Sequence, residues 1–188
     1  MDPEGPRIAI DAMGGDSGPA AVVAGAARAK RKDGSLHFLL FGDEKLLKAE
    51  LKRHQGLKSG NGITIVHTAE AIGAGDKPSQ AIRRARTTSM GMAINAVKDG
   101  NADAALSAGN TGAMMAMAKL ALRTMPGIDR PALAALLPTL GDQDCVMLDL
   151  GANTECDVQN LVQFAVMGAA YARTVLDISK PRVKLLNI

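Results

Sequence analysis

Short apolar runs alternate along this chain with longer segments in which apolar residues recur at a helical period. The short runs have no clean apolar–polar alternation, which is typical of strands covered on both faces of a sheet. We expect strands at residues 7–11, 36–41, 63–67, 104–107, 132–137, 145–150 and 183–188. We expect helices at residues 20–32, 44–54, 90–99, 111–123 and 158–176, and a further helix that is capped by Ser79 and runs through Arg83.

This order of elements indicates the fold class. Strands that alternate with helices predict a mainly parallel sheet covered on both faces, a three-layer α/β/α Rossmann-like fold. The chain has 188 residues, of which 47% are hydrophobic, so it is long enough for one large domain with a sizeable core. We therefore expect a single α/β domain over residues 1–188.

Three loops that follow predicted strands are rich in glycine and small polar residues: 14–19, 109–112 and 151–153. Ligands bind beyond the carboxyl ends of parallel strands, and glycine lets a ligand approach the backbone closely. Asn110 or Thr111 can cap the following helix, whose free N–H groups and dipole favour an anion. The three loops predict an anion pocket on one sheet edge; for the loop at 109–112 alone, an ordinary strand-to-helix turn is the alternative.

The remaining chemistry-bearing residues form no standard catalytic or metal motif. The three histidines are not spaced as metal ligands, and Cys145 and Cys156 are too few and too far apart for a disulfide framework or a zinc site. We expect no metal. The G-x-G-x-x-G and G-x-x-x-x-G-K-[ST] fingerprints are absent. Ser107 lacks a nucleophile elbow, so we interpret it as a hydroxyl donor to an anion.

A pocket of donors without a protein nucleophile fits a reaction whose nucleophile is itself a bound anion. Arg83 and Arg84 are candidate phosphate ligands because a guanidinium binds phosphate bidentately; exposure on a helix face is the alternative. Asp11, Asp16 and Asp149 lie at or near strand ends, where each either orients a loop or takes part in catalysis.

Charge and composition narrow the classes of partner and compartment. Aromatic residues make up 2% of the chain, which disfavours modules that stack nucleic-acid bases, so no nucleic-acid partner is expected. The net charge is +3, and basic residues cluster at 28–32, 45–53 and 83–86. Such clusters are usually solvated helix faces, and a surface that binds an acidic partner is the alternative. Two cysteines, no signal-peptide pattern and no membrane-spanning run predict a cytoplasmic protein.

Six short segments in register carry a resemblance to a known family. They are A-M-G-G-D-x-x-P at 12–19, P-S-Q-A-I-R at 78–83, S-A-G-N-T-G-A at 107–113, R-P-A-L at 130–133, L-D-L-G-A-N at 148–153 and L-L-N-I at 185–188. Together they resemble the bacterial phosphate acyltransferase family, PlsX. The resemblance covers the chain from Arg7 onward.

This resemblance implies that inorganic phosphate attacks the thioester of a fatty acyl-acyl carrier protein, giving acyl phosphate and free carrier protein for phospholipid synthesis. It implies a fold similar to that of isocitrate and isopropylmalate dehydrogenases and phosphate acetyltransferases, and no cofactor. It also implies a homodimer that associates peripherally with the cytoplasmic membrane. The alternatives are a phosphate acetyltransferase acting on acetyl-coenzyme A and a non-catalytic anion-binding scaffold module.

Carried onto this sequence, the matching motifs imply a set of site residues. Asn110 and Asn153 are expected to be catalytic. The residues expected to bind phosphate are Gly14, Gly15, Asp16, Arg83, Ser107, Gly109, Thr111 and Gly112. In the family, the L-L-N-I strand continues into a glycine, an acidic stretch and a Lys-Gly, whereas this chain stops at Ile188. We therefore expect a truncated chain with little acyl-transfer activity by itself.

Overall fold

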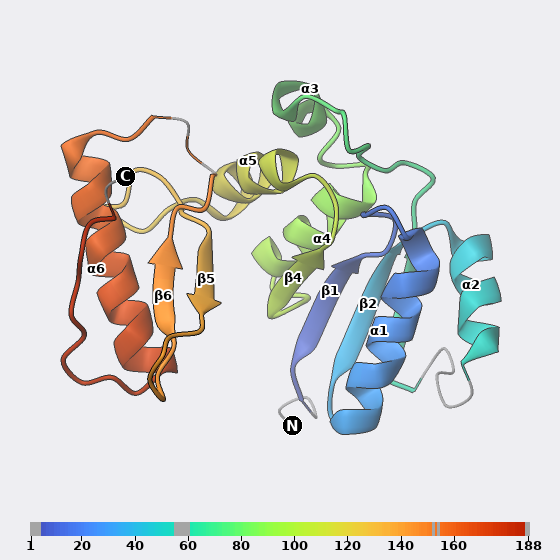
Figure 1. The fold of residues 1–188 in the computed structure, drawn as a ribbon. Helices are drawn as coiled ribbons and strands as arrows, with labels where there is room; N and C mark the ends of the chain where they lie inside the picture. The colour runs from blue at the N-terminus through green and yellow to red at the C-terminus, as the bar shows by residue number, and fades with distance from the viewer. Residues whose placement is uncertain (1–4, 55–60, 152, 154, 187–188) are drawn as a thin grey trace. The chain divides into compact units, whose positions relative to one another are not determined.

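The computed structural model describes residues 5–54, 61–151, 153 and 155–186 (Figure 1). Contacts divide the chain into two compact units, Met1–Arg123 and Thr124–Ile188, and each is described by itself. The organisation of the whole chain as one domain stays a prediction.

A parallel four-stranded sheet forms the centre of the first unit. Its strands are β1 (Arg7–Asp11), β2 (His37–Gly42), β3 (Ile63–His67) and β4 (Ala104–Ser107). Their order in the sheet is β3-β2-β1-β4, so β1 lies between β2 and β4. The register pairs Asp11 with Phe41 on one side and with Ser107 on the other. The last residues of β1 and β4 therefore lie side by side at the carboxyl edge.

Helices cover both faces of this sheet, which confirms the three-layer arrangement (Figure 1). Helices α1 (Gly18–Lys32) and α2 (Glu44–Arg53) pack on one face around Leu40, which is fully buried. Helix α4 (Ser89–Lys98) packs on the other face. Helices α3 (Pro78–Arg83) and α5 (Thr111–Leu122) join α4 in a separate apolar cluster.

The alternation of side chains along β1 explains the two cores. Ile8 and Ile10 pack among the side chains of α1 and α2, whereas Ala9 faces α4, where it meets Ala93 and Ala96. Small side chains on both sides of this second interface let the helix backbone lie close to the sheet, so the amino-terminal end of α4 reaches the carboxyl edge of β1.

The second unit holds a two-stranded sheet and one long helix. Strands β5 (Ala134–Leu137) and β6 (Cys145–Leu148) pair antiparallel, and α6 (Val158–Val175) packs on β6. Asp157 caps α6 as predicted. Its side chain accepts from the backbone N–H of Asn160, whose own side chain accepts from the N–H of Asp157, a reciprocal capping box.

Several predictions about individual elements are wrong. The strand after the polar turn at 139–144 pairs only with β5 and is not part of the parallel sheet, because a short connection returns a strand antiparallel to its predecessor. Helix α3 begins at Pro78 with Lys77 as its cap, so Ser79 lies inside the first turn. Residues 183–186 pair with no strand, and 187–188 lie outside the described residues. Among the helices of the described ranges, none is long and apolar enough to cross a membrane.

Candidate anion site

Two of the predicted glycine loops meet at the carboxyl edge of the parallel sheet. The loop after β1 and the loop after β4 leave neighbouring strands whose last residues, Asp11 and Ser107, are paired in the register. A Cβ added to Gly14 would lie 2.9 Å from the backbone nitrogen of Gly109, and one added to Gly109 would lie 3.3 Å from the Cα of Gly14. The two backbones touch, and glycine is needed at the contact.

The carboxylate of Asp11 ties these loops to the sheet. Asp11 is buried, and its Oδ2 accepts a hydrogen bond of 2.7 Å from the Ser107 hydroxyl. Its Oδ1 accepts from the Ser89 hydroxyl at 2.6 Å and from the backbone N–H of Met13 at 3.3 Å. Ser89 is the first residue of α4, where the helix dipole favours a negative charge. The carboxylate is therefore paired with hydrogen-bond donors on three segments.

Gly15 further restricts the conformation of the loop after β1. Its φ of +87° lies in the region that side chains disfavour, and an added Cβ would lie 3.0 Å from the carbonyl oxygen of Ala108. Gly14 also has no room for a side chain, since an added Cβ would lie 2.5 Å from Oδ2 of Asp11. This part of the loop has no room for a larger residue.

The amino-terminal end of α5 lies directly after the second loop. Asn110 caps the helix, as predicted: its Oδ1 accepts from the backbone N–H of Ala113 at 2.9 Å. In the part of the chain that the structure describes, the N–H groups of Thr111 and Gly112 have no acceptor, and both residues are exposed. These two donors and the positive end of the helix dipole favour an anion.

A third loop joins the other two through Asn110. The Nδ2 of Asn110 donates to the carbonyl oxygens of Ala74 at 2.9 Å and of Asp76 at 3.0 Å. The segment at 73–77 is held further by Arg84, which contacts the carboxylates of Asp76 and Glu70. Because its amide hydrogens are both engaged, Asn110 acts here as a clamp between α5 and this loop.

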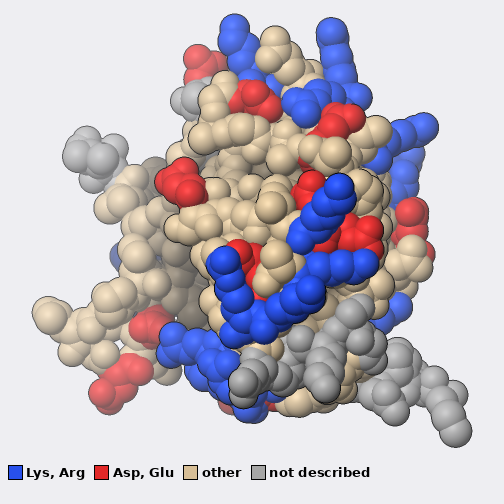
Figure 2. Space-filling view, turned by 90° about the vertical axis from the view of Figure 1, so that its right-hand side faces the viewer, with Lys and Arg blue, Asp and Glu red and all other residues tan. Residues whose placement is uncertain are grey.

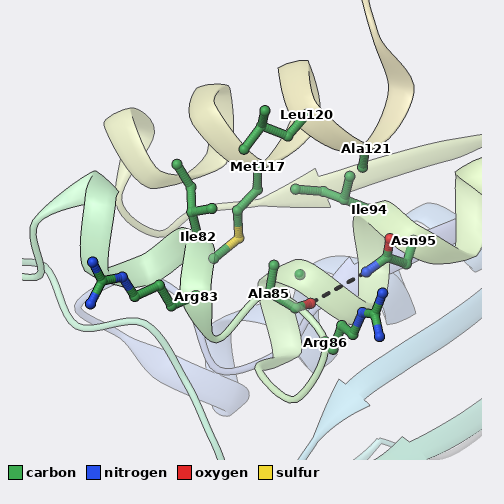
Figure 3. A pocket seen from close by; sticks show the side chains of 10 residues that line it. Ile82, Arg83, Ala85, Arg86, Ile94, Asn95, Met117, Leu120 and Ala121 are labelled. Carbon is green, nitrogen blue, oxygen red and sulfur yellow. Dashed lines mark hydrogen bonds between the residues drawn. The ribbon is translucent and has the colours of Figure 1, made fainter.

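Arg83 lies elsewhere in the first unit. It lines a cavity of about 300 Å³ between α3, α4 and α5, with Ile82, Ile94 and Met117 among the apolar walls (Figure 3). Figure 3 shows the guanidinium groups of Arg83 and Arg86 extending away from each other. Arg83 is exposed at the end of α3. Its role as a phosphate ligand stays a prediction.

The remaining predicted site residues are not brought into the network. Asp16 is exposed on the loop after β1. Asn153 belongs to the second unit, where its Nδ2 donates to Asp149 at 2.9 Å and to the carbonyl of Pro131 at 3.3 Å. The third glycine loop therefore follows a strand of a different sheet. The expectation that all three loops share one sheet edge is wrong for that loop.

A thiol lies beside Asn153 in the second unit. The Sγ of Cys156 lies 3.4 Å from Oδ2 of Asp149. Partial burial, and then this hydrogen bond to a carboxylate, raise the pKa of the Cys156 thiol above its usual value. The thiol is therefore a weak nucleophile at neutral pH.

Sequence reasoning missed two contributors to the site. Neither Ser89 nor the segment at 73–77 is among the site residues that the sequence predicts. Ser89 lies 78 residues from Asp11, so no local pattern pointed to their contact. Gly73, Gly75 and Pro78 are typical of an irregular loop, but nothing in them indicates its attachment to Asn110. Among the described residues, no group of three or more metal-ligating side chains comes together.

Comparisons with known proteins agree with the resemblance seen in the motifs. A family model described as fatty acid synthesis protein matches residues 6–188. A phosphate acyltransferase of Erythrobacter litoralis is 60% identical over 183 residues, which are 97% of this chain and 51% of the relative. A phosphate acyltransferase of Rhodospirillum rubrum is 52% identical over 96% of this chain and 51% of its own length. The chain thus spans about half the length of the curated relatives it matches.

Proposed function

This chain belongs to the fatty acid synthesis protein family, and we propose that the whole protein is a phosphate acyltransferase. It transfers the acyl group of a fatty acyl-acyl carrier protein to inorganic phosphate and so supplies acyl phosphate for phospholipid synthesis. The observation that carries this proposal is the 60% identity, over nearly the whole chain, to a protein named phosphate acyltransferase.

The two touching glycine loops fit the phosphate half of this reaction. A phosphate oxygen attacks the thioester carbonyl, the carbon–sulfur bond breaks, and the carrier protein leaves as its thiol. The nucleophile is the bound phosphate, so the protein has to position it and to stabilise developing negative charge. The N–H groups of Thr111 and Gly112, at the start of α5, are the donors that we assign to the anion.

The carrier protein and the membrane are proposed partners of the whole protein. Figure 2 shows a face with many Lys and Arg side chains and with Asp and Glu side chains among them. Some charged side chains of the first unit are paired within the chain, as in Lys48–Glu44 and Arg53–Glu50. We propose that an acidic carrier protein binds through basic side chains that do not form such ion pairs. A homodimer in the cytoplasm, peripherally bound to the membrane, completes the proposal; light scattering and co-sedimentation with anionic vesicles test these two properties.

The test of the activity uses the full-length protein with purified acyl-acyl carrier protein and phosphate. Acyl phosphate, trapped as its hydroxamate, is the expected product, and acetyl-coenzyme A in place of the carrier protein is expected to give little. A larger rate with acetyl-coenzyme A would identify a phosphate acetyltransferase instead. No product with either donor would favour a non-catalytic anion-binding module.

Two substitutions test whether the predicted residues act in turnover. Asn110→Ala releases the clamp between α5 and the loop at 73–77, and Arg83→Ala removes a candidate phosphate ligand. Both are expected to reduce turnover by tenfold or more. Arg173→Ala is the matched control, because Arg173 is also an exposed arginine on a helix, α6, and lies outside the three basic clusters. Unchanged turnover in both test variants would contradict the assigned site.

A further inference from the structure

We infer that the cavity between α3, α4 and α5 is a binding site for an anionic amphiphile, a single alkyl chain that ends in a carboxylate or a phosphate group. The described residues that line this cavity lie outside the two glycine loops, so the inference concerns a second site and goes beyond the proposed function. A thioester is uncharged at the head of its chain, so this ligand also differs from the thioester substrate.

Buried apolar side chains form the floor of the cavity. Ile94 of α4 and Met117 of α5 are each 2% exposed, and Ile82 of α3 packs against them. Leu120 also lines the cavity but is 62% exposed, so it lies at the opening (Figure 3). An alkyl chain in the cavity is therefore covered by apolar carbon from three helices.

Contacts of the segment that follows α3 hold the walls in place. A Cβ added to Gly91 would overlap the carbonyl oxygen of Ala85, so this segment lies directly against α4. The side-chain amide of Asn95 donates a hydrogen bond of 3.3 Å to the same oxygen. The cavity therefore exists before a ligand binds, and binding requires little rearrangement.

The charged side chains that line the cavity are basic. Arg83 and Arg86 belong to the lining, and none of the described lining residues is acidic. The two guanidinium groups lie on different sides of the cavity (Figure 3). In the part of the chain that the structure describes, the ion pairs of this segment, with Glu70 and Asp76, are made by Arg84 instead. Two arginines beside an apolar floor complement an oxyanion attached to an alkyl chain.

A larger cavity beside the first is less suited to this ligand. It has a volume of about 740 Å³ and shares Arg86 and Asn95 with the first, but Lys98 and Asp99 both line it. The carboxylate of Asp99 repels an anion at short range and offsets the nearby basic charge. The charge of the lining therefore favours the first cavity.

The volume of the first cavity limits the length of chain that it can hold. At about 300 Å³ it has the volume of roughly ten water molecules, and a methylene group is about as large as a water molecule. Each methylene group that leaves water tightens binding by about two- to fourfold, the lower value applying where the group stays partly exposed. We therefore expect the affinity to rise with chain length up to roughly ten carbon atoms and then to level off.

The experiment measures the binding of fatty carboxylates to the full-length protein by isothermal titration calorimetry, at concentrations too low for micelles. The series is butanoate, hexanoate, octanoate, decanoate and dodecanoate. We expect one site per chain, with decanoate bound about tenfold or more tightly than hexanoate and dodecanoate bound no more tightly than decanoate. Equal affinity across the series, or no binding, would overturn the inference.

Two further ligands test the head group. Decanol has the same chain without the charge, and it should bind about fivefold or more weakly than decanoate. Decyl phosphate carries the other head group, and the tighter of the two anions identifies the head that the arginines select. Decanol bound as tightly as both anions would contradict the assigned role of the arginines.

Paired substitutions separate this local charge from the net charge of the protein. Arg83→Gln combined with Arg86→Gln should reduce the preference for decanoate over decanol to about twofold or less. Arg28→Gln combined with Arg31→Gln removes the same charge from exposed positions of α1 and should leave the preference unchanged. The inference fails if the first pair keeps the wild-type preference, or if both pairs lose it equally.

Ala121→Leu tests the cavity by filling it. Ala121 lines the cavity from α5 and is partly buried, so a larger apolar side chain there takes up part of the space for the ligand. Affinity should level off at a shorter chain, and decanoate should bind about fivefold or more weakly. Ala24→Leu, at an exposed position of α1, is the matched control and should change neither property. An unchanged chain-length profile in Ala121→Leu would place the ligand elsewhere and reject the inference.

These binding measurements do not depend on turnover. Decanoate binding without acyl transfer would reject the proposed activity alone. Acyl transfer by a protein that binds neither decanoate nor decyl phosphate would reject this inference alone.

Discussion

The side-chain amide of Asn110 donates a hydrogen bond of 3.0 Å to the carbonyl oxygen of Asp76, which joins the start of α5 to the loop before α3. The same side chain caps α5 through its oxygen. One residue thus serves two segments, and its two functions can be separated.

Asn110→Asp keeps the capping oxygen but loses the two amide donors, whereas Asn110→Ala loses the capping oxygen as well as the donors. We expect Asn110→Ala to destabilise the protein by about 1 kcal/mol more than Asn110→Asp, the usual contribution of a helix cap. Thermal unfolding of the full-length variants measures this difference. Hydrogen exchange in residues 73–77 should rise in both variants; if it stays at the wild-type level, the clamp does not hold the loop in solution.

Gly14→Ala is expected to disrupt the contact between the two glycine loops. The new Cβ would lie 2.5 Å from Oδ2 of Asp11 and 2.9 Å from the nitrogen of Gly109, so the loops must separate at a cost of about 1–3 kcal/mol. Phosphate binding, measured by calorimetry, should weaken.

Gly25→Ala is the control for this change. Gly25 lies in α1, with no atom within 4 Å of an added Cβ, so alanine there should raise stability by about 0.5–1 kcal/mol. Phosphate binding should not change. Equal phosphate affinity in Gly14→Ala and Gly25→Ala would show that the close approach of the loops is not required.

The cap of α2 predicts a dependence of stability on pH. Asp43 accepts the backbone N–H groups of Leu46 and Lys45, and these hydrogen bonds, the first above all, lower its pKa below the ordinary 3.8. A pKa that is lower in the folded state contributes stability that is present above 3.8 and is lost as the pH falls through the folded value.

Asp43→Asn keeps a capping oxygen without the titration, so its thermal unfolding temperature should fall less steeply than that of the wild type in this acidic range. Hydrogen exchange of α2 at several pH values provides a local measure. Identical acid dependence in the two proteins would contradict the assignment to Asp43.

The two cysteines are expected to differ in reactivity. Cys145 is exposed, whereas Cys156 is partly buried beside Asp149, and both burial and that carboxylate raise its pKa. Iodoacetamide should therefore modify Cys145 first at neutral pH, and Cys156 only as the pH rises. Mass spectrometry of the labelled peptides measures both rates.

Asp149→Asn should speed the labelling of Cys156, because the neutral amide no longer disfavours the thiolate. Asparagine tolerates the positive φ of 64° at this position, so the backbone should be retained. A faster reaction at Cys156 than at Cys145 in the wild type would contradict this prediction.

The sequence predicts the local parts of this structure well. The glycine loop at 14–15, the turn at Gly109 and the cap at Asn110 follow from residues within a few positions of each other. The predicted location of the loop at 151–153 is wrong because the connection at 139–144 is short, and a short connection makes the next strand antiparallel to its predecessor.

Contacts between distant residues were not predictable from these patterns. The hydroxyl of Ser89 reaches Asp11 only because α4 crosses the sheet on small alanine side chains, and a sequence motif does not encode that crossing. The same holds for the two amide hydrogens of Asn110, whose acceptors lie 34 and 36 residues earlier. Sequence periodicity predicts the elements, whereas their packing determines which polar groups meet.

The position of β1 between β2 and β4 has a consequence for folding during synthesis. β1, β2 and β3 are complete by residue 67, whereas Ser107 emerges from the ribosome 96 residues after Asp11. Until β4 is made, one side of β1 is an open edge with unpaired backbone groups, able to pair with another chain. Pairing over such a long separation also closes late, because loop closure costs entropy before contacts repay it. We therefore expect the anion site to form last in the first unit. We also expect the nascent chain to be prone to aggregation until β4 has been synthesised and has paired with β1.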